Sequence, residues 1–448
     1  MPPTSDSVLS GPLASAQLVS GPADVAEGRP GRWVLLLLLF VGLIFNYIHR
    51  SALSVATPAI MHDLGLSKAA MGVLLSSFFW VYALLQVPLG WLTDRFGVKY
   101  LYGFSYAFWC LASMTTGLAS SFAMILALRI LVGMGEAVVF PASTRAVAHW
   151  FPPSQRGTAT GLYTTGVRVG IIIATVFGAL LLAHYGWKML FVISGAAGLP
   201  WLFGWFGFFA HYDRRDRTDS GREANLRKTA GMRGGLVKEF IGQARLLRYR
   251  ATWGVSLGFL CYDYAWYVYV TWLPAYLMLD RHFSLKETGL YASLPIVCNT
   301  IVTPIAGILS DRLIAGGVEE IRARKLFLAG GLLLGCLIVP AGLVHSPYTS
   351  VALLSGSLFG LGFVGPNSWT ITTAVAPREL VGTLAGVQNF WGNVGGIVAP
   401  ALTGYIAYAT GSFVAALMFT GVVLLLGAVF YVFLIPGKII LAAEAAAP

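Results

Sequence analysis

Six ionisable side chains stand near the middle of long apolar runs, where charged groups are rare. An ionised group in an apolar environment is costly unless it is paired or faces water, so each such residue is by default a hypothesis for a functional site. They are His49, Arg50, Arg129, Glu136, Arg168 and Asp263. Arg145 also lies in an apolar run, but close to its end, where we expect its guanidinium to reach the surface.

Arg50 suits the recognition of an anion. A guanidinium presents a planar fork of donors that fits a carboxylate, and a dry cavity strengthens that pairing. We interpret Arg50 as the anchor of a carboxylate ligand, with a structural ion pair to Glu136 or Asp263 as the alternative. His49, directly before it, changes charge near neutral pH, so it is either a proton-transfer group or a neutral, hydrogen-bonded histidine.

Arg129 and Glu136 are seven residues apart, so on a helix they share one face. They lie too far apart along the axis for a close pair, which leaves Glu136 free to meet another partner. A buried carboxylate of this kind can bind and release a proton as its partners move. The alternative is a permanent salt bridge that holds helices together. Asp263 is a second candidate for the same proton-coupling role.

Arg168 stands between Gly166 and Gly170, small residues that let a neighbouring helix approach. A second deep arginine favours a ligand with two anionic groups, or with one carboxylate and a polar or aromatic ring. The alternative is that Arg168 is the charge partner of Asp263 or Glu136.

Further polar side chains can complete a binding site. Asn389 and Asn393 are one helical turn apart, and two amides at that spacing can hydrogen-bond a hydroxylated ligand. Tyr47 and Tyr82 offer apolar surface with a hydroxyl tip. We therefore expect a binding site made of Arg50, Tyr47, Tyr82, Arg168, Asn389 and Asn393.

The composition identifies the elements that must hold these residues. Of 448 residues, 57% are hydrophobic and 11% are charged, against about 25% charged residues in an ordinary soluble domain. The mean hydropathy is +0.73. A helix needs about 20 apolar residues to cross a bilayer. The chain is therefore expected to be a polytopic membrane protein, which excludes a soluble enzyme and a disordered protein.

Apolar runs between charged or Pro/Gly breaks predict twelve spans. They cover 33–58, 68–92, 100–119, 122–148, 158–183, 188–210, 252–278, 286–309, 326–345, 347–373, 381–408 and 412–435. We expect an all-α membrane protein with a disordered tail over 1–32, a six-helix bundle over 33–210, a cytoplasmic loop over 211–250, a second six-helix bundle over 251–436 and a C-terminal tail over 437–448.

Basic residues indicate the orientation. Most of the 30 Lys and Arg residues fall on one side of the predicted spans, and many lie in the central loop. By the positive-inside rule that side is cytoplasmic, as are both termini. The net charge of +11 is therefore explained by topology, and we expect no nucleic-acid partner.

One motif occurs in both halves. GxxxDR follows the second predicted span as Gly90, Asp94 and Arg95, and it follows the eighth as Gly307, Asp311 and Arg312. The glycine lets two helices approach, and the aspartate can cap a neighbouring helix N-terminus or pair with an arginine. Such a motif can hold one conformation of two rocking bundles as a cytoplasmic gate. The alternative is a pair of ordinary positive loops.

Together these features resemble the anion:cation symporter family of the major facilitator superfamily. The resemblance runs from about residue 33 to 435 and is carried by the GxxxDR repeat and by five segments. These are 46–56 (NYIHRSALSVA), 80–82 (WVY), 129–142 (with Arg129, Glu136 and FPA), 150–158 (WFP and RGT) and 271–274 (TWLP). The family includes galactonate, hexuronate, glucarate and phthalate permeases and sialin-type carriers.

The resemblance implies a secondary transporter that imports an organic carboxylate by proton symport, with a sugar acid, hydroxy acid or aromatic acid as substrate. It implies that Arg50 binds the substrate carboxylate and that Glu136, supported by Arg129, couples protons. The chain departs from many relatives by having His49 before the arginine, where they have Asp, and by having Asp263. An exchanger or uniporter without proton coupling is the alternative function.

Other functional classes find no support in the sequence. There is no HExxH, nucleophile elbow or P-loop, and the four cysteines form neither CxxC nor a Cys/His cluster, which argues against a metal site and against ATP as energy source. We expect no enzyme activity, no cofactor and no metal. The expected partners are a small organic anion, a proton and the lipid bilayer, and we expect a monomer.

Overall fold

A computed structural model describes residues 29–66, 68–212, 244–283 and 285–439. Nearly all of the two predicted tails and most of the predicted loop 211–250 lie outside the described residues. Within these ranges every regular element is a helix, as the sequence predicts.

The first half of the chain forms six spans, three of which are interrupted. Their elements are α2 (Arg32–Leu64), α3 (Lys68–Phe96), α4 (Val98–Thr116), α5 (Phe122–Glu136), α6 (Val139–Trp150), α7 (Pro153–Thr164), α8 (Gly166–Gly198) and the helical residues 201–212. The fourth span is α5 with α6, the fifth is α7 with the start of α8, and the sixth is the end of α8 with residues 201–212. Gly186, with φ of 76°, ends the fifth span inside α8, because a positive φ breaks the helix.

The second half repeats this arrangement. A short 3₁₀ turn, η1 (Ala244–Arg248), leads into α11 (Arg250–Leu279), α12 (Leu285–Ala315), α13 (Glu320–Gly335), α14 (Ile338–Leu343), α15 (Pro347–Val375), the turn η2 (Arg378–Leu380), α16 (Val381–Thr410) and α17 (Val414–Phe433). The ninth span is α13 with α14.

Nine helical stretches in the described part of the chain are long and apolar enough to cross a membrane. The other three spans are α4, α11 and α16, with 19, 30 and 30 residues. Tyrosine and tryptophan lower the hydropathy of α4 and α11, and glycine and amide side chains lower that of α16, without shortening these helices. The expected twelve-helix, two-bundle architecture is confirmed.

The GxxxDR motifs lie within helices, which corrects their expected place in the loops after the spans. α3 continues to Phe96 and α12 continues to Ala315. α3 stops only where Gly97 takes a φ of 79°. Charged residues extend these helices because the neighbouring bundle supplies hydrogen-bond partners at their ends.

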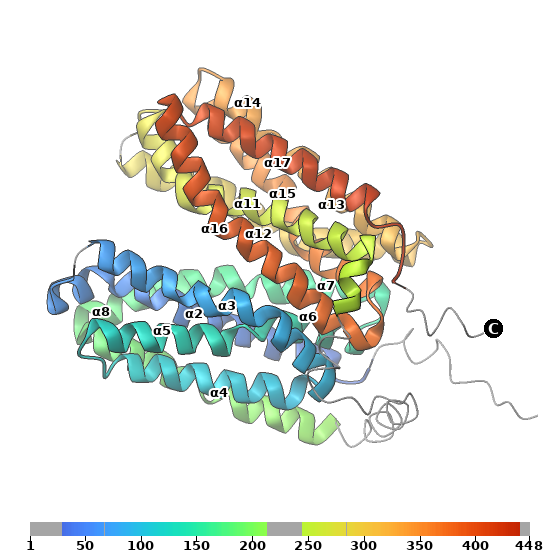
Figure 1. Cartoon of the computed structure of the whole chain (residues 1–448), viewed down its shortest axis with the longest axis horizontal. Coiled ribbons are helices and arrows are strands. Elements are labelled where there is room, and N and C mark those ends of the chain that lie inside the picture. Colours follow the sequence, from blue (N-terminus) through green and yellow to red (C-terminus); the bar gives the residue numbers. More distant parts are fainter. Residues whose placement is uncertain (1–28, 67, 213–243, 284, 440–448) are drawn as a thin grey trace, which may run out of the picture.

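The two bundles meet at one end and diverge toward the other (Figure 1). α3 packs along α16, and α7 packs along α12. A Cβ on Gly90 would collide with the backbone of Gly382, and one on Gly307 would collide with the backbone of Gly157. Glycine is thus required at both crossings. We call this end, which contains Asp94 and Asp311, the latch end.

Candidate functional site

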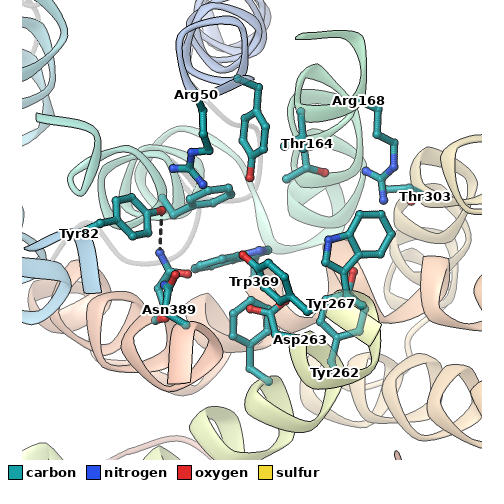
Figure 2. Close-up of a pocket in the computed structure, with 17 residues that line it drawn as sticks. Arg50, Tyr82, Thr164, Arg168, Tyr262, Asp263, Tyr267, Thr303, Trp369 and Asn389 are labelled. Atoms are coloured by element: carbon teal, nitrogen blue, oxygen red, sulfur yellow. Dashed lines mark hydrogen bonds between the residues drawn. The ribbon is translucent and has the colours of Figure 1, made fainter. Parts of the chain in front are cut away.

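A cavity of about 110 Å³ lies between the two bundles. Both bundles supply its walls, and Figure 2 shows arginines of the first bundle facing an aspartate and an asparagine of the second. The lining residues are Tyr47, Arg50, Tyr82, Phe140, Thr164, Val167, Arg168, Phe259, Tyr262, Asp263, Trp266, Tyr267, Thr303, Gly365, Trp369, Asn389 and Asn393. All six residues expected to bind a ligand are among them.

Arg50 projects from α2 into this cavity and is held from behind by Glu136. Its Nε and Nη2 donate to Glu136 Oε2 over 3.3 and 3.2 Å. The guanidinium lies 4.8, 4.4 and 4.8 Å from the ring centroids of Tyr47, Phe78 and Tyr82. Cation–π contacts of this kind favour the charged form. The Arg50 side chain remains 15% exposed, whereas Glu136 is fully buried.

A buried polar group lies behind Arg50. Arg129 is 3% exposed and Asn46 is fully buried. Glu136 Oε1, Arg129 Nε and both amide atoms of Asn46 have no hydrogen-bond partner among the described residues. Unsatisfied buried polar atoms are costly, so this group has spare capacity for water or for a changed pairing. As expected, no salt bridge joins Arg129 to Glu136 in the described structure.

His49 lies away from the cavity. It is 1% exposed, and its Nε2 lies 3.0 Å from the main-chain oxygen of Ser194. Because a carbonyl can only accept, Nε2 carries the hydrogen. Nδ1 is buried without a partner in the described structure. This arrangement favours the neutral, hydrogen-bonded interpretation over the proton-transfer one.

Arg168, from α8, has neither Asp263 nor Glu136 as a partner. Its Nη2 donates to Asn299 Oδ1 of α12, and its guanidinium lies 5.2 Å from the ring centroid of Trp266. Asn299 is held in turn by donating to the main-chain oxygen of Leu358 over 2.9 Å. Arg168 therefore keeps its positive charge unneutralised at the cavity wall.

Asp263, from α11, faces the cavity across from Arg50 (Figure 2). Within the described ranges no Lys, Arg or His nitrogen comes within 4.0 Å of its carboxylate. The side chain fits against α16 at Gly392, where a Cβ would collide with Asp263 Oδ2. The carboxylate is thus placed by backbone packing and not by a charge partner.

Amides and aromatic rings complete the wall. Asn389 Nδ2 donates to Tyr82 Oη over 3.5 Å (Figure 2), and Asn393 Nδ2 donates to the main-chain oxygen of Asn389 over 2.7 Å. Phe140 stacks on Trp369 across the two bundles, with centroids 5.0 Å apart and planes at 12°. The Asn389 amide links the two bundles, and the stacked Phe140–Trp369 pair forms a flat apolar surface.

Several wall residues were not expected from the sequence. Thr303 on α12 and the rings of Phe140, Phe259 and Trp266 were missed, as was Asn299, which does not line the cavity but binds Arg168. A polar side chain within an apolar run was the available signal for Thr303 and Asn299. Aromatic residues are too frequent in this chain, at 13%, for single rings to stand out.

At the latch end, Asp94 joins α3 to the N-terminus of α16. Its Oδ1 accepts from the Gly382 amide over 2.8 Å, and its Oδ2 accepts from the amide and hydroxyl of Thr383 over 2.6 and 2.7 Å. Arg145 Nη1 donates to Oδ1 over 2.5 Å. A carboxylate at a helix N-terminus is favourable because free amides and the helix dipole both point at it.

Asp311 makes the equivalent connection from α12 to the start of α7. Its Oδ1 accepts from the Gly157 amide over 3.0 Å, and its Oδ2 accepts from the Thr158 amide over 2.6 Å. Arg324 Nη2 donates to Oδ1 over 2.7 Å. Each bundle thus contributes one aspartate that binds backbone amides of the other bundle.

The arginine partners at the latch end differ from expectation. Arg145 is 6% exposed, so it does not reach the surface as expected, and Arg324 is fully buried. Arg145 and Arg324, the arginines that donate to the two aspartates, lie outside the motif. Arg95 lies 5.9 Å from the Trp91 ring centroid, and Arg312 is exposed.

Residues 39–400 match the sequence profile of a family described as the Major Facilitator Superfamily. A protein named probable galactarate/D-glucarate transporter from Bacillus subtilis (strain 168) is 33% identical over 408 residues, 87% of this chain and 89% of that protein. A D-galactonate transporter from Escherichia coli O6:H1 is 30% identical over 422 residues, 92% of this chain and 98% of that protein. The family resemblance expected from the sequence is confirmed.

Among solved structures, the fucose:proton symporter of E. coli is similar with a TM-score of 0.65. The match covers 91% of this chain and 100% of the symporter at 16% sequence identity. At that identity the similarity concerns the fold alone, which agrees with the two-bundle architecture.

Proposed function

The chain belongs to the major facilitator superfamily, and on that premise we propose that it is a secondary active transporter that imports an organic carboxylate together with protons. The named relatives are transporters and not enzymes. Their sugar-acid substrates support an organic acid as the transported compound. The substrate is a sugar acid, a hydroxy acid or an aromatic acid.

One observation carries this proposal, the pairing of Arg50 with Glu136 at the cavity wall. The arginine faces the cavity, while the carboxylate that holds it is fully buried behind it. A substrate carboxylate needs the same guanidinium donors that Glu136 Oε2 occupies. An anion from the cavity and the Glu136 carboxylate therefore compete for one cation.

That competition provides proton coupling. A proton on Glu136 removes the competing charge and releases Arg50 to the substrate. By linkage, a bound substrate favours the proton on Glu136 to the same extent. Arg129, with its free Nε, offers the ionised Glu136 a second partner when the proton leaves.

The contacts at the latch end account for alternating access to the cavity. Asp94 and Asp311 close the cavity at that end by binding amides across the bundle seam, and the bundles diverge at the other end. Basic residues place the latch end in the cytoplasm. On this proposal the closed latch end faces the cytoplasm, the protein faces outward in a plasma membrane, and both termini lie inside.

A carboxylate panel and a transport assay together test the proposal. A ligand that binds the folded state raises the melting temperature of the purified protein, so the panel identifies a substrate for proteoliposomes. An inward pH gradient should then drive accumulation of that compound, and a protonophore should abolish it. Uptake that the protonophore leaves unchanged would favour the exchanger or uniporter instead. No stabilising carboxylate in the panel would contradict carboxylate transport itself.

A further inference from the structure

Asp263 is a carboxylate inside a cavity proposed to bind a carboxylate, and no cation neutralises it in the described structure. Resting on the proposed function, we infer that Asp263 sets substrate specificity. It admits monocarboxylates whose far end carries a hydrogen-bond donor, such as a hydroxyl or ammonium group, and it excludes dicarboxylates.

The two charged poles of the cavity support this inference. Arg50 comes from α2 in the first bundle and Asp263 comes from α11 in the second, and they face each other across the cavity (Figure 2). A substrate that gives its carboxylate to Arg50 places its other end toward Asp263. An ionised carboxylate accepts hydrogen bonds and donates none, so it binds hydroxyl or ammonium groups there and repels a second carboxylate.

The charges of the cavity wall agree with a monoanion. Among the described arginines, lysines and carboxylates, the wall contains Arg50, Arg168 and Asp263. One positive charge is therefore in excess, which one substrate carboxylate balances. Glu136 and Arg129 lie behind the wall, and their opposite charges cancel. Two substrate carboxylates would exceed the positive charge of the wall.

The position of Asp263 makes it difficult for the protein to relieve this repulsion. The side chain is fixed against Gly392 of α16, where α11 and α16 pack closely. Arg168 is the other cation of the cavity wall, but its Nη2 is bound to Asn299, and its guanidinium lies over Trp266. Like charges brought together at a binding site are unfavourable enough to reject a ligand.

Two matched pairs of ligands test the inference, one pair of sugar acids and one pair of aromatic acids. Galactonate and galactarate differ only at one end, which is a hydroxymethyl group in the first and a carboxylate in the second. 4-Hydroxybenzoate and terephthalate share an aromatic ring with one carboxylate, and the hydroxyl of the first is a second carboxylate in the second. For the wild-type protein we expect at least one monocarboxylate to bind about 10- to 100-fold more tightly than its dicarboxylate partner, measured by calorimetry on purified protein.

The Asp263→Asn variant should reduce that preference by about tenfold or more, mainly by strengthening dicarboxylate binding. Asp263→Glu retains the charge and should keep the preference, and Glu319→Gln, an exposed carboxylate at 56%, controls for a general change of charge. Melting temperatures report folding of each variant. Equal binding of the two members of a pair by wild type, or an unchanged preference in Asp263→Asn, would overturn the inference. Failure of the wild type to bind any carboxylate in a wider panel would instead overturn the proposed function.

Discussion

Arg50 and Arg168 are alike in the sequence, each a single arginine within an apolar run, but they have different partners. Arg50 is paired with a buried carboxylate, whereas Arg168 is hydrogen-bonded to a neutral amide. Protonation of Glu136 can weaken the first pairing. Asn299 does not take up a proton, so the second pairing does not depend on protonation. We therefore assign the proton-dependent anchor to Arg50 and a constant positive charge to Arg168.

Replacing Arg50 by lysine should reduce substrate affinity by roughly one to two orders of magnitude. Lysine keeps the charge but loses the planar fork, and hydrogen bonds between charged groups contribute about 1.5–3 kcal/mol each. Calorimetry and uptake into proteoliposomes measure the loss. Arg322→Lys, at a side chain that is 81% exposed, is the matched control. Wild-type affinity in Arg50→Lys would contradict the anchor assignment.

Glu136→Gln should separate net transport from exchange. Glutamine resembles the protonated acid, so substrate binding should be retained. Exchange should also be retained, because the carrier returns loaded and no proton has to leave. Uptake driven by a pH gradient should fall by at least about tenfold, because the empty carrier must release its proton to complete the cycle.

Proteoliposomes with and without internal substrate distinguish these cases, and the melting temperature reports folding. If Glu136 only holds helices together, the substitution should destabilise the protein and reduce binding and exchange together. Continued accumulation against the gradient by Glu136→Gln would also disprove the coupling role. The same assay on Asp263→Asn examines the other acid that the sequence suggests for this role.

The sequence predicts which side chains carry charge into the cavity but not which atoms they meet. Arg50, Arg168 and Asp263 stand out because charge within an apolar run is costly. Asn299 does not, since an asparagine is neutral and its contact with Arg168 joins residues far apart in the chain. The same reason applies to Arg324, whose contact with Asp311 the sequence alone does not reveal. Its partner Asp311 is brought to it only by the packing of α13 on α12.

At the scale of elements, hydropathy locates the spans but places their ends poorly. α3 and α12 extend past the predicted ends of their spans, residues 92 and 309, where Asp94 and Asp311 bind backbone amides of the opposite bundle. The break between α5 and α6 and that between α7 and α8 fall inside continuous apolar runs. Membrane-spanning helices can be interrupted in this way where neighbouring helices satisfy the freed groups, and hydropathy does not detect it.

The two latch aspartates allow a prediction about these helix ends. In Asp94→Asn or Asp311→Asn the side chain loses its charge and one of its acceptor atoms, so the α3–α16 or α7–α12 connection weakens. We expect transport to fall about tenfold while substrate affinity changes less than about threefold, because a helix-capping contact contributes about 1 kcal/mol and lies away from the cavity.

Binding affinity and turnover measured side by side examine this prediction. The two variants should behave alike, since each aspartate makes the same kind of contact. A large loss of affinity with normal turnover, in either variant, would contradict a role in conformational cycling.

At the scale of the whole molecule, the two halves repeat one design. Composition and the GxxxDR repeat are sufficient to predict two six-helix bundles, because twelve apolar runs and an internal repeat leave few other architectures. They do not predict which end is closed. That depends on whether the aspartates are bound to the opposite bundle, a property of one state of the molecule and not of the sequence.

If the bundles rock about the central cavity, a bound substrate should change distances in opposite senses at the two ends. Spin labels at Ser120 and His345, exposed residues near the diverging end, should move closer together. Labels at Tyr100 and Val318, exposed residues near the latch end, should move apart as Asp94 and Asp311 release their amides. Electron–electron distance measurements in nanodiscs, with and without the substrate found by thermal shift, record both changes. Because rigid bundles can close at one end only by opening at the other, the two distances should shift together and in proportion across substrate concentrations. A change at one end alone would show that a local gate moves while the bundles stay in place, and alternation by rocking would then be wrong for this protein.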